Sequence, residues 1–303
     1  MRLATSLKLL YKLPLCGAAF FVGLAAGGAV LPLLGLEAPA MPEGTDANTV
    51  ALWFLLGNMV LALPLSWLSR RLAGGWTRRW LVLALLAWVC SAVNMVLEAF
   101  FFMETGAVSS TGSGLFTMLN LLLPCLTLSG AVARLFRPRV AEPGADLRIG
   151  WRAFWSQHRP AAWTWRLGLV LLAYPAIYVA FGLLVQPLIV DYYTQGAYEL
   201  AAPTWEQLVP LQLARSALLL LACLPVLIAW RGTRKTLFWT LGIAITVCTA
   251  FMAVLTAYWF PWQLRVYHGL ELLADALAYA AVLVSLLSST RGGVPVRKAA
   301  LAT

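Results

Sequence analysis

Long apolar stretches separated by short polar segments run along the whole chain. A helix needs about 20 consecutive apolar residues to cross a bilayer, because its backbone amides must all be hydrogen-bonded within the segment. Eight stretches are long enough: residues 13–34, 50–68, 80–102, 115–135, 167–189, 208–230, 237–259 and 264–287. The first could also be a secretory signal, but its length and the spans that follow favour a helix. The pattern predicts an all-α integral membrane protein with eight transmembrane helices.

Composition and charge agree with a membrane location. The chain is 61% hydrophobic and 11% charged, whereas a soluble domain has about 25% charged residues. The net charge of +10 could indicate a nucleic-acid partner, but nearly all of the 22 Lys and Arg residues fall in alternate segments between the predicted helices. Such residues collect on the cytoplasmic side of membrane proteins. We therefore expect membrane lipids and no nucleic acid as partners, an inner (plasma) membrane location, and cytoplasmic N- and C-termini.

A weak internal repeat is visible along the chain. Three motifs recur in the same order at separations of 155, 161 and 156 residues: Leu31-Pro32-Leu33 with Gln186-Pro187-Leu188, Leu63-Pro64 with Leu224-Pro225, and Thr77-Arg78-Arg79 with Thr233-Arg234-Lys235. Because four helices separate the matching elements, a duplication would give two parallel four-helix repeats related by an axis along the membrane normal. Chance explains the same matches, since prolines and basic pairs are common, and both explanations stay open.

The helices divide the chain into four parts. Residues 1–136 hold helices one to four, 137–166 form a cytoplasmic linker, 167–290 hold helices five to eight, and 291–303 are a cytoplasmic tail. The linker places Trp151, Phe154 and Trp155 at helical spacing beside Arg152 and Arg159, which predicts an amphipathic helix at the membrane interface. Such a helix could recognise anionic lipids or simply anchor the linker.

Polar side chains at membrane depth are the main clue to function. Each charge there costs roughly 2.5–3.5 kcal/mol on insertion scales and therefore needs a partner or a task. The candidates are Asn94 and Glu98 in helix three, Arg215 in helix six, and Arg265, His268, Glu271 and Asp275 in helix eight. Helical spacing puts each set on one face of its helix. All lie in the predicted outer half of the membrane, so we expect them to form an outward-facing site.

Three functions are compatible with this site. Ionisable residues inside membranes often bind protons or small solutes, which makes a transporter-like role the first hypothesis. The second is an enzyme that uses His268 and a carboxylate on a periplasmic or lipid-borne substrate. The third is purely structural: buried ion pairs that fix how the helices pack. The sequence does not determine whether the protein is catalytic or which solute it would bind.

No cofactor is indicated by a strong motif. His268 and Glu271 stand three residues apart and could be two ligands of a metal ion, but this pattern is weak and zinc prefers more His or Cys ligands. The chain has no Gly-rich phosphate loop, and its only other histidine, His158, lies on the predicted cytoplasmic side. We therefore expect neither a nucleotide nor a haem.

Overall fold

The computed structural model describes residues 2–39, 45–102, 111–138, 147–195, 200 and 202–288, and within them nearly every element is a helix. The α-helices are α1 (Arg2–Val30), α2 (Ala47–Ser69), α3 (Trp76–Trp88), α4 (Asn94–Phe102), α5 (Thr111–Leu135), α6 (Leu147–Trp155), α7 (Pro160–Thr194), α8 (Trp205–Ala229), α9 (Arg234–Thr246), α10 (Met252–Thr256) and α11 (Trp262–Leu287). The described chain also contains a 3-10 turn, η1 (Pro32–Leu34), and two π-helical turns, η2 (Val89–Val93) and η4 (Val247–Phe251).

The helices make this chain a multi-pass membrane protein. Seven helical segments in the described ranges are long and apolar enough to span a bilayer: Tyr11–Leu34, Ala47–Ser69, Trp76–Phe102, Gly112–Leu135, Pro160–Thr194, Trp205–Ala229 and Trp262–Leu287. They correspond to seven of the eight predicted helices. The remaining prediction, residues 237–259, is divided among α9, η4 and the five-residue α10. The all-α membrane fold is therefore confirmed, and the eighth span stays a prediction.

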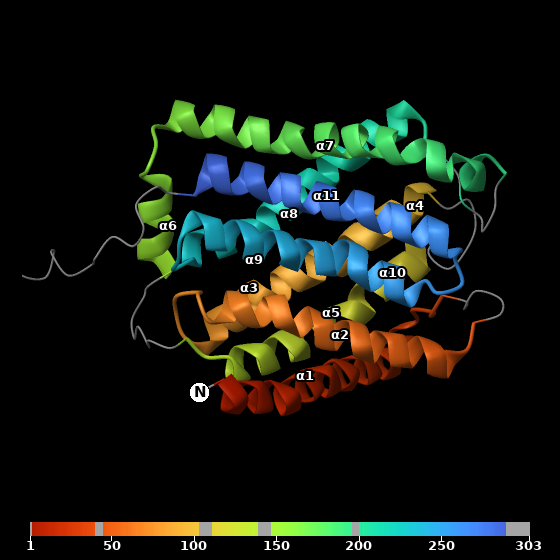
Figure 1. Cartoon of the computed structure of the whole chain (residues 1–303), viewed down its shortest axis with the longest axis horizontal. Helices are drawn as coiled ribbons and strands as arrows, with labels where there is room; N and C mark the ends of the chain where they lie inside the picture. Colours follow the sequence, from red (N-terminus) through yellow and green to blue (C-terminus); the bar gives the residue numbers. More distant parts are fainter. Residues whose placement is uncertain are drawn as a thin grey trace, which may run out of the picture.

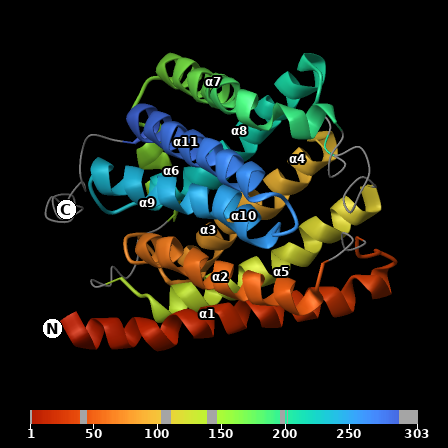
Figure 2. The ribbon, with the colours of Figure 1, turned by 45° about the vertical axis from the view of Figure 1, so that its right-hand side comes forward.

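The two halves of the chain lie beside one another (Figure 1). Helices α1, α2 and α5 occupy one side of the bundle and α7, α8 and α11 the other, with α1 and α7 along opposite edges (Figure 2). The short helix α6 lies across the end where α1 begins. It falls within the predicted linker, with Trp151 exposed and Phe154 buried, and its place at the membrane interface stays a prediction. The predicted tail at 291–303 lies outside the described residues.

Matching features occur 158 residues apart in the two halves. Helices α3 and α9 both have 13 residues, and a five-residue π-helical turn follows each. The turns have similar sequences, VCSAV and VCTAF. Before each helix, Leu72 and Trp230 pair in an isolated antiparallel bridge, with Ala73 N donating to Ala229 O and Arg231 N to Arg71 O, both at 2.8 Å. The bridge joins equivalent positions of the two halves.

Close glycine contacts pack the outer helices onto the bundle. A Cβ added at Gly23 of α1 would lie 2.5 Å from Pro124 Cα of α5, so the two backbones are in direct contact. In the other half, a Cβ at Gly182 of α7 would lie 3.2 Å from Glu271 Oε1 of α11. Small residues permit this approach between membrane helices. The Gly23-x-x-x-Gly27 pattern in the sequence therefore serves packing inside the bundle.

Basic side chains cap the carboxyl ends of α5 and α11. Lys12 Nζ donates to Leu135 O at 2.6 Å, and a guanidinium nitrogen of Arg166 donates to Leu286 O. The last carbonyls of a helix have no partner within it, and cations near them also interact favourably with the helix dipole. Both caps lie at the end of the bundle where the sequence concentrates Lys and Arg.

Candidate functional site

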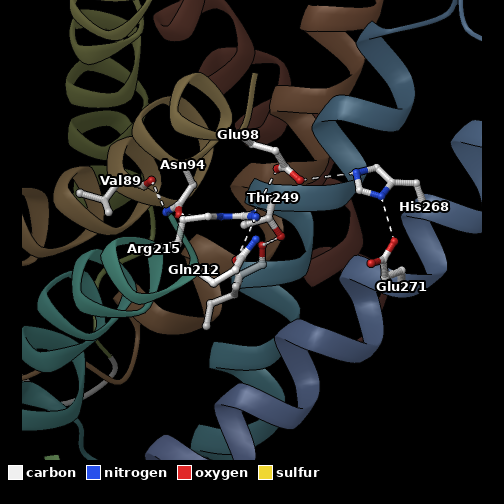
Figure 3. A network of polar contacts seen from close by, with 9 residues as sticks. Val89, Asn94, Glu98, Gln212, Arg215, Thr249, His268 and Glu271 are labelled. Atoms are coloured by element: carbon white, nitrogen blue, oxygen red, sulfur yellow. Dashed lines mark hydrogen bonds and ion pairs between the residues drawn. The ribbon is translucent and has the colours of Figure 1, made fainter. Parts of the chain in front are cut away.

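Glu98, Arg215, His268 and Glu271 converge from three helices, α4 of the first half of the chain and α8 and α11 of the second (Figure 3). Arg215 Nη2 of α8 lies 3.1 Å from Glu98 Oε2 of α4. The other oxygen of that carboxylate, Oε1, lies 3.9 Å from His268 Nε2 of α11, and His268 Nδ1 lies 3.1 Å from Glu271 Oε2. Charges that are far apart in the sequence thus form one continuous chain of contacts.

The π-helical turn η2 determines which way Asn94 and Glu98 point. A π turn places one extra residue in a helix, and this turns the following segment by about 100° relative to an unbroken α-helix. The backbone N–H of Asn94 donates to Val89 O, and its side-chain Nδ2 donates to the same carbonyl at 2.8 Å. Asn94 therefore closes the turn and leaves its Oδ1 free to accept from Arg215.

Arg215 is buried, with 1% of its surface exposed, and is surrounded by polar and aromatic partners. Besides Glu98, its Nε donates to Asn94 Oδ1 and its Nη1 to Gln212 Oε1, both at 3.4 Å. The rings of Tyr174 and Tyr178 on α7 lie 5.6 and 5.7 Å from its guanidinium carbon, within cation–π range. We call Asn94, Glu98, Gln212, Arg215, His268 and Glu271 the polar network.

Two predicted site residues lie outside the polar network. Asp275 is 1% exposed on α11, and neither of its carboxyl oxygens has a hydrogen-bond partner. Arg265 donates from Nη1 to Val254 O at 3.3 Å, while its buried Nε has no partner. Among the described residues, no carboxylate lies in ion-pair contact with Arg265. The structure therefore brings five of the seven predicted residues into contact and leaves these two unpaired.

A cavity of about 440 Å³ adjoins the polar network. Glu98, Arg265, His268 and Glu271 line one part of it, which we call its polar end. The last three lie within two turns of α11, and Glu98 reaches His268 across the helices. The remaining wall is mostly apolar and aromatic and includes Phe102, Tyr178, Leu183, Tyr193, Phe260 and Leu264. Its volume lies in the range of about 300–1,000 Å³ that is typical of small-molecule sites. His268 is 28% exposed and Glu98 21%, so these two side chains are accessible from the cavity.

Helix α7 contributes to the site, which the sequence analysis did not predict. Tyr174, Tyr178 and Gly182 lie on one face of this helix at successive intervals of four residues. The two tyrosines contact Arg215, and Gly182 leaves room for Glu271. An aromatic stripe that ends in a glycine was the available signal, but in an apolar helix it resembles ordinary core packing.

The positions 158 residues away from Arg215 and Asn94 carry no charge. At a separation of 158 residues, Arg215 corresponds to Gly57 and Asn94 to Met252. A Cβ added at Gly57 would lie 2.7 Å from Met252 Sδ, so the methionine occupies the space beside that glycine. The same helix packing is therefore achieved there with uncharged residues.

The described residues give no further support for a metal centre. Among the described residues, no group of three or more His, Cys, Asp or Glu side chains is arranged to hold a metal ion. His268 and Glu271 are in contact with each other, and both are also part of the ion-pair chain. All five cysteines are buried and free.

Comparisons with known proteins give no match to a protein-family model, a curated protein or a solved structure. The function must therefore be inferred from the residues of this chain.

Proposed function

We propose that this protein is a transporter-like membrane protein that binds a small solute in the cavity beside the polar network. The observation that carries the proposal is the contact between an apolar cavity of about 440 Å³ and four charged or titratable side chains. Membrane helices rarely hold such residues unless these line a cavity or a substrate path. In this proposal the cavity opens on the outer side of the inner membrane, opposite the end that carries most of the Lys and Arg residues.

We further propose eight spans in two parallel four-helix repeats. The correspondence at 158 residues supports this arrangement, because α2 and α8, α3 and α9, and the two π turns all begin at that separation. Segment α3–η2–α4 spans residues Trp76–Phe102, so its counterpart α9–η4–α10 would be the eighth span. The distribution of Lys and Arg supports cytoplasmic termini.

The contact between Gly57 and Met252 argues against a purely structural role for the charges. Gly57 and Met252 pack at the positions that correspond to Arg215 and Asn94 without any ion pair. Burying two charges costs several kcal/mol each, and replacing such a pair by well-packed apolar residues is often neutral or stabilising. In this proposal the fold does not require the network, and a ligand-binding task accounts for its presence.

Two groups are suited to proton exchange in this proposal. His268 lies between two carboxylates, Glu98 and Glu271, with which its imidazole can exchange a proton. Asp275 has no donor on either oxygen, as expected of a neutral carboxylic acid in an apolar setting. Release of the His268 proton would change the charge next to the solute, and release of the Asp275 proton would change the charge one helical turn from Glu271.

The enzyme hypothesis is less well supported by the geometry. A histidine acting as general base needs one ring nitrogen oriented by a partner and the other facing the substrate. Glu271 contacts Nδ1 of His268, but Nε2 faces Glu98 Oε1 at 3.9 Å. A carboxylate thus lies where a substrate proton would have to be.

Filling the cavity tests the proposal. Ala99 lines the cavity on α4, whereas Ala18 is exposed on the outer face of α1. We expect Ala99→Trp to abolish binding of small amphiphiles and Ala18→Trp to leave it unchanged. Binding of radiolabelled n-decanol, n-decanoate and n-decyltrimethylammonium would be measured on protein in lipid nanodiscs, with empty nanodiscs subtracted. Equal binding of all three probes by both variants and the parent would overturn the proposal, and uptake of a bound probe into proteoliposomes would then test transport.

A further inference from the structure

We propose that the solute of this cavity is an amphipathic anion whose negatively charged head binds Arg265 and whose apolar body occupies the rest of the cavity. The inference rests on the proposed function, because it assigns a chemical class to the same site. It depends on three observations: which charges are already paired, what remains unpaired at the cavity, and the chemistry of the wall.

Both carboxylates at the cavity already have partners: Glu98 has the cation Arg215, and Glu271 has the imidazole of His268, which is a cation when it is protonated. Glu98 forms an ion pair with Arg215 at 3.1 Å, and Arg215 is held in turn by Asn94 and Gln212. Glu271 contacts His268 at 3.1 Å. A cationic solute would have to displace one of these partners, and a buried charge that loses its partner is costly. The site is therefore poorly suited to a cation.

Arg265 is the cation at the cavity whose charge is not balanced. A guanidinium has five N–H donors in a planar fork. The structure records one bond, from Nη1 to Val254 O at 3.3 Å, and leaves the buried Nε without an acceptor. In the part of the chain that is described, no carboxylate pairs with it. A carboxylate or phosphate oxygen from a solute would satisfy both the unused donors and the charge.

Asp275 does not supply the missing negative charge. It lies ten residues beyond Arg265 on α11, about 15 Å along the helix axis at 1.5 Å per residue. It does not line the cavity, and its two oxygens have no donor, which is the setting of a neutral carboxyl group. With His268 protonated, the described residues around the cavity leave one unpaired positive charge, on Arg265.

The wall of the cavity determines the rest of the solute. Apart from the polar end, its lining is dominated by aliphatic and aromatic side chains such as Leu183, Val190, Phe260 and Leu264. Apolar surface contributes roughly 25 cal/mol per Å² removed from water, whereas a polar body would lose its hydration without gaining partners. A single acidic head on an apolar chain or ring fits both ends of the site.

Three probes that share a ten-carbon chain test the head group without altering the protein. In nanodiscs at neutral pH, we expect n-decanoate to bind at least tenfold more tightly than n-decanol, and n-decyltrimethylammonium to bind most weakly. Equal affinities for the three probes, or a preference for the cation, would overturn the inference.

Variants of Arg265 test the residue. We expect Arg265→Gln to weaken n-decanoate binding at least tenfold while n-decanol binding stays unchanged, and Arg265→Lys to restore part of the affinity. Arg152→Gln, an exposed arginine on α6, is the control and should bind as the parent does. Thermal melting of each variant would show whether it folds. If Arg265→Gln does not fold, the comparison of the three probes on the parent protein tests the anion inference.

The outcomes separate this inference from the proposed function. If Ala99→Trp abolishes binding but Arg265→Gln leaves n-decanoate affinity intact, the cavity is a binding site and the anion inference is wrong. If Ala99→Trp changes the binding of none of the three probes, both fail. The cavity and the anion inference are both supported if n-decanoate binding is lost in Ala99→Trp and in Arg265→Gln while n-decanol binding is lost only in Ala99→Trp.

Discussion

Arg215 on α8 and Glu98 on α4 are 117 residues apart in the sequence, and their side chains meet at 3.1 Å within the bundle. The guanidinium is fully buried and makes its remaining contacts to neutral groups. Removing either partner leaves an uncompensated charge, whereas removing both leaves none. The energetic role of the pair can therefore be separated from its role in binding.

We predict that Glu98→Gln and Arg215→Gln will each lower the free energy of unfolding by about 3–5 kcal/mol. The double variant should recover most of that loss, because it holds no unpaired charge. Thermal or chemical denaturation of the purified protein in one detergent would measure all three. A double variant as unstable as the sum of the single variants would favour the structural explanation of the charges.

The contact between α1 and α5 gives a second prediction, with an adjacent control. Gly23→Ala would push a methyl group into the backbone of Pro124, and we expect a loss of about 1–3 kcal/mol, typical of overpacking. Gly28 has nothing within 4 Å of its added Cβ. Gly28→Ala should be neutral or slightly stabilising, since alanine favours helix. Equal melting temperatures for the two variants would contradict this packing.

Much of the fold could be predicted from the sequence, because spanning helices are determined by length and apolarity. The candidate site could be predicted in part. The helical spacing of His268 and Glu271 was sufficient to place them on one face, and their cost in lipid marked them as unusual. The direction of Asn94 and Glu98 depends on the π turn at Val89–Val93, and ordinary helical periodicity gives no sign of it. The contribution of Tyr174 and Tyr178 depends on how α7 docks, which is a tertiary property.

The proposed orientation can be tested with introduced cysteines, because all five native cysteines are buried. Asn48, at the start of α2, and Gln157, between α6 and α7, are both exposed and lie at opposite ends of the bundle. In right-side-out vesicles, we expect a membrane-impermeant maleimide to label Asn48→Cys and not Gln157→Cys. Both should react once the membrane is solubilised. The opposite labelling pattern would reverse the orientation and place the cavity on the cytoplasmic side.

Asp275 allows the proton-exchange proposal to be examined separately from stability. Its carboxyl group has no donor and is buried beside the network, so Asn, which is uncharged and has nearly the same shape, should replace it at a cost of less than about 1 kcal/mol. Asp275→Asn cannot release a proton. We therefore expect a normal melting temperature and normal binding of n-decanoate in nanodiscs, but no proton movement coupled to its uptake in proteoliposomes loaded with a pH-sensitive dye. The matched control is Asp191→Asn, an exposed carboxylate near the end of α7, which should behave as the parent. A large loss of stability in Asp275→Asn would mean that the native carboxyl is charged and supports the fold. Unchanged proton coupling would instead assign the exchange to His268.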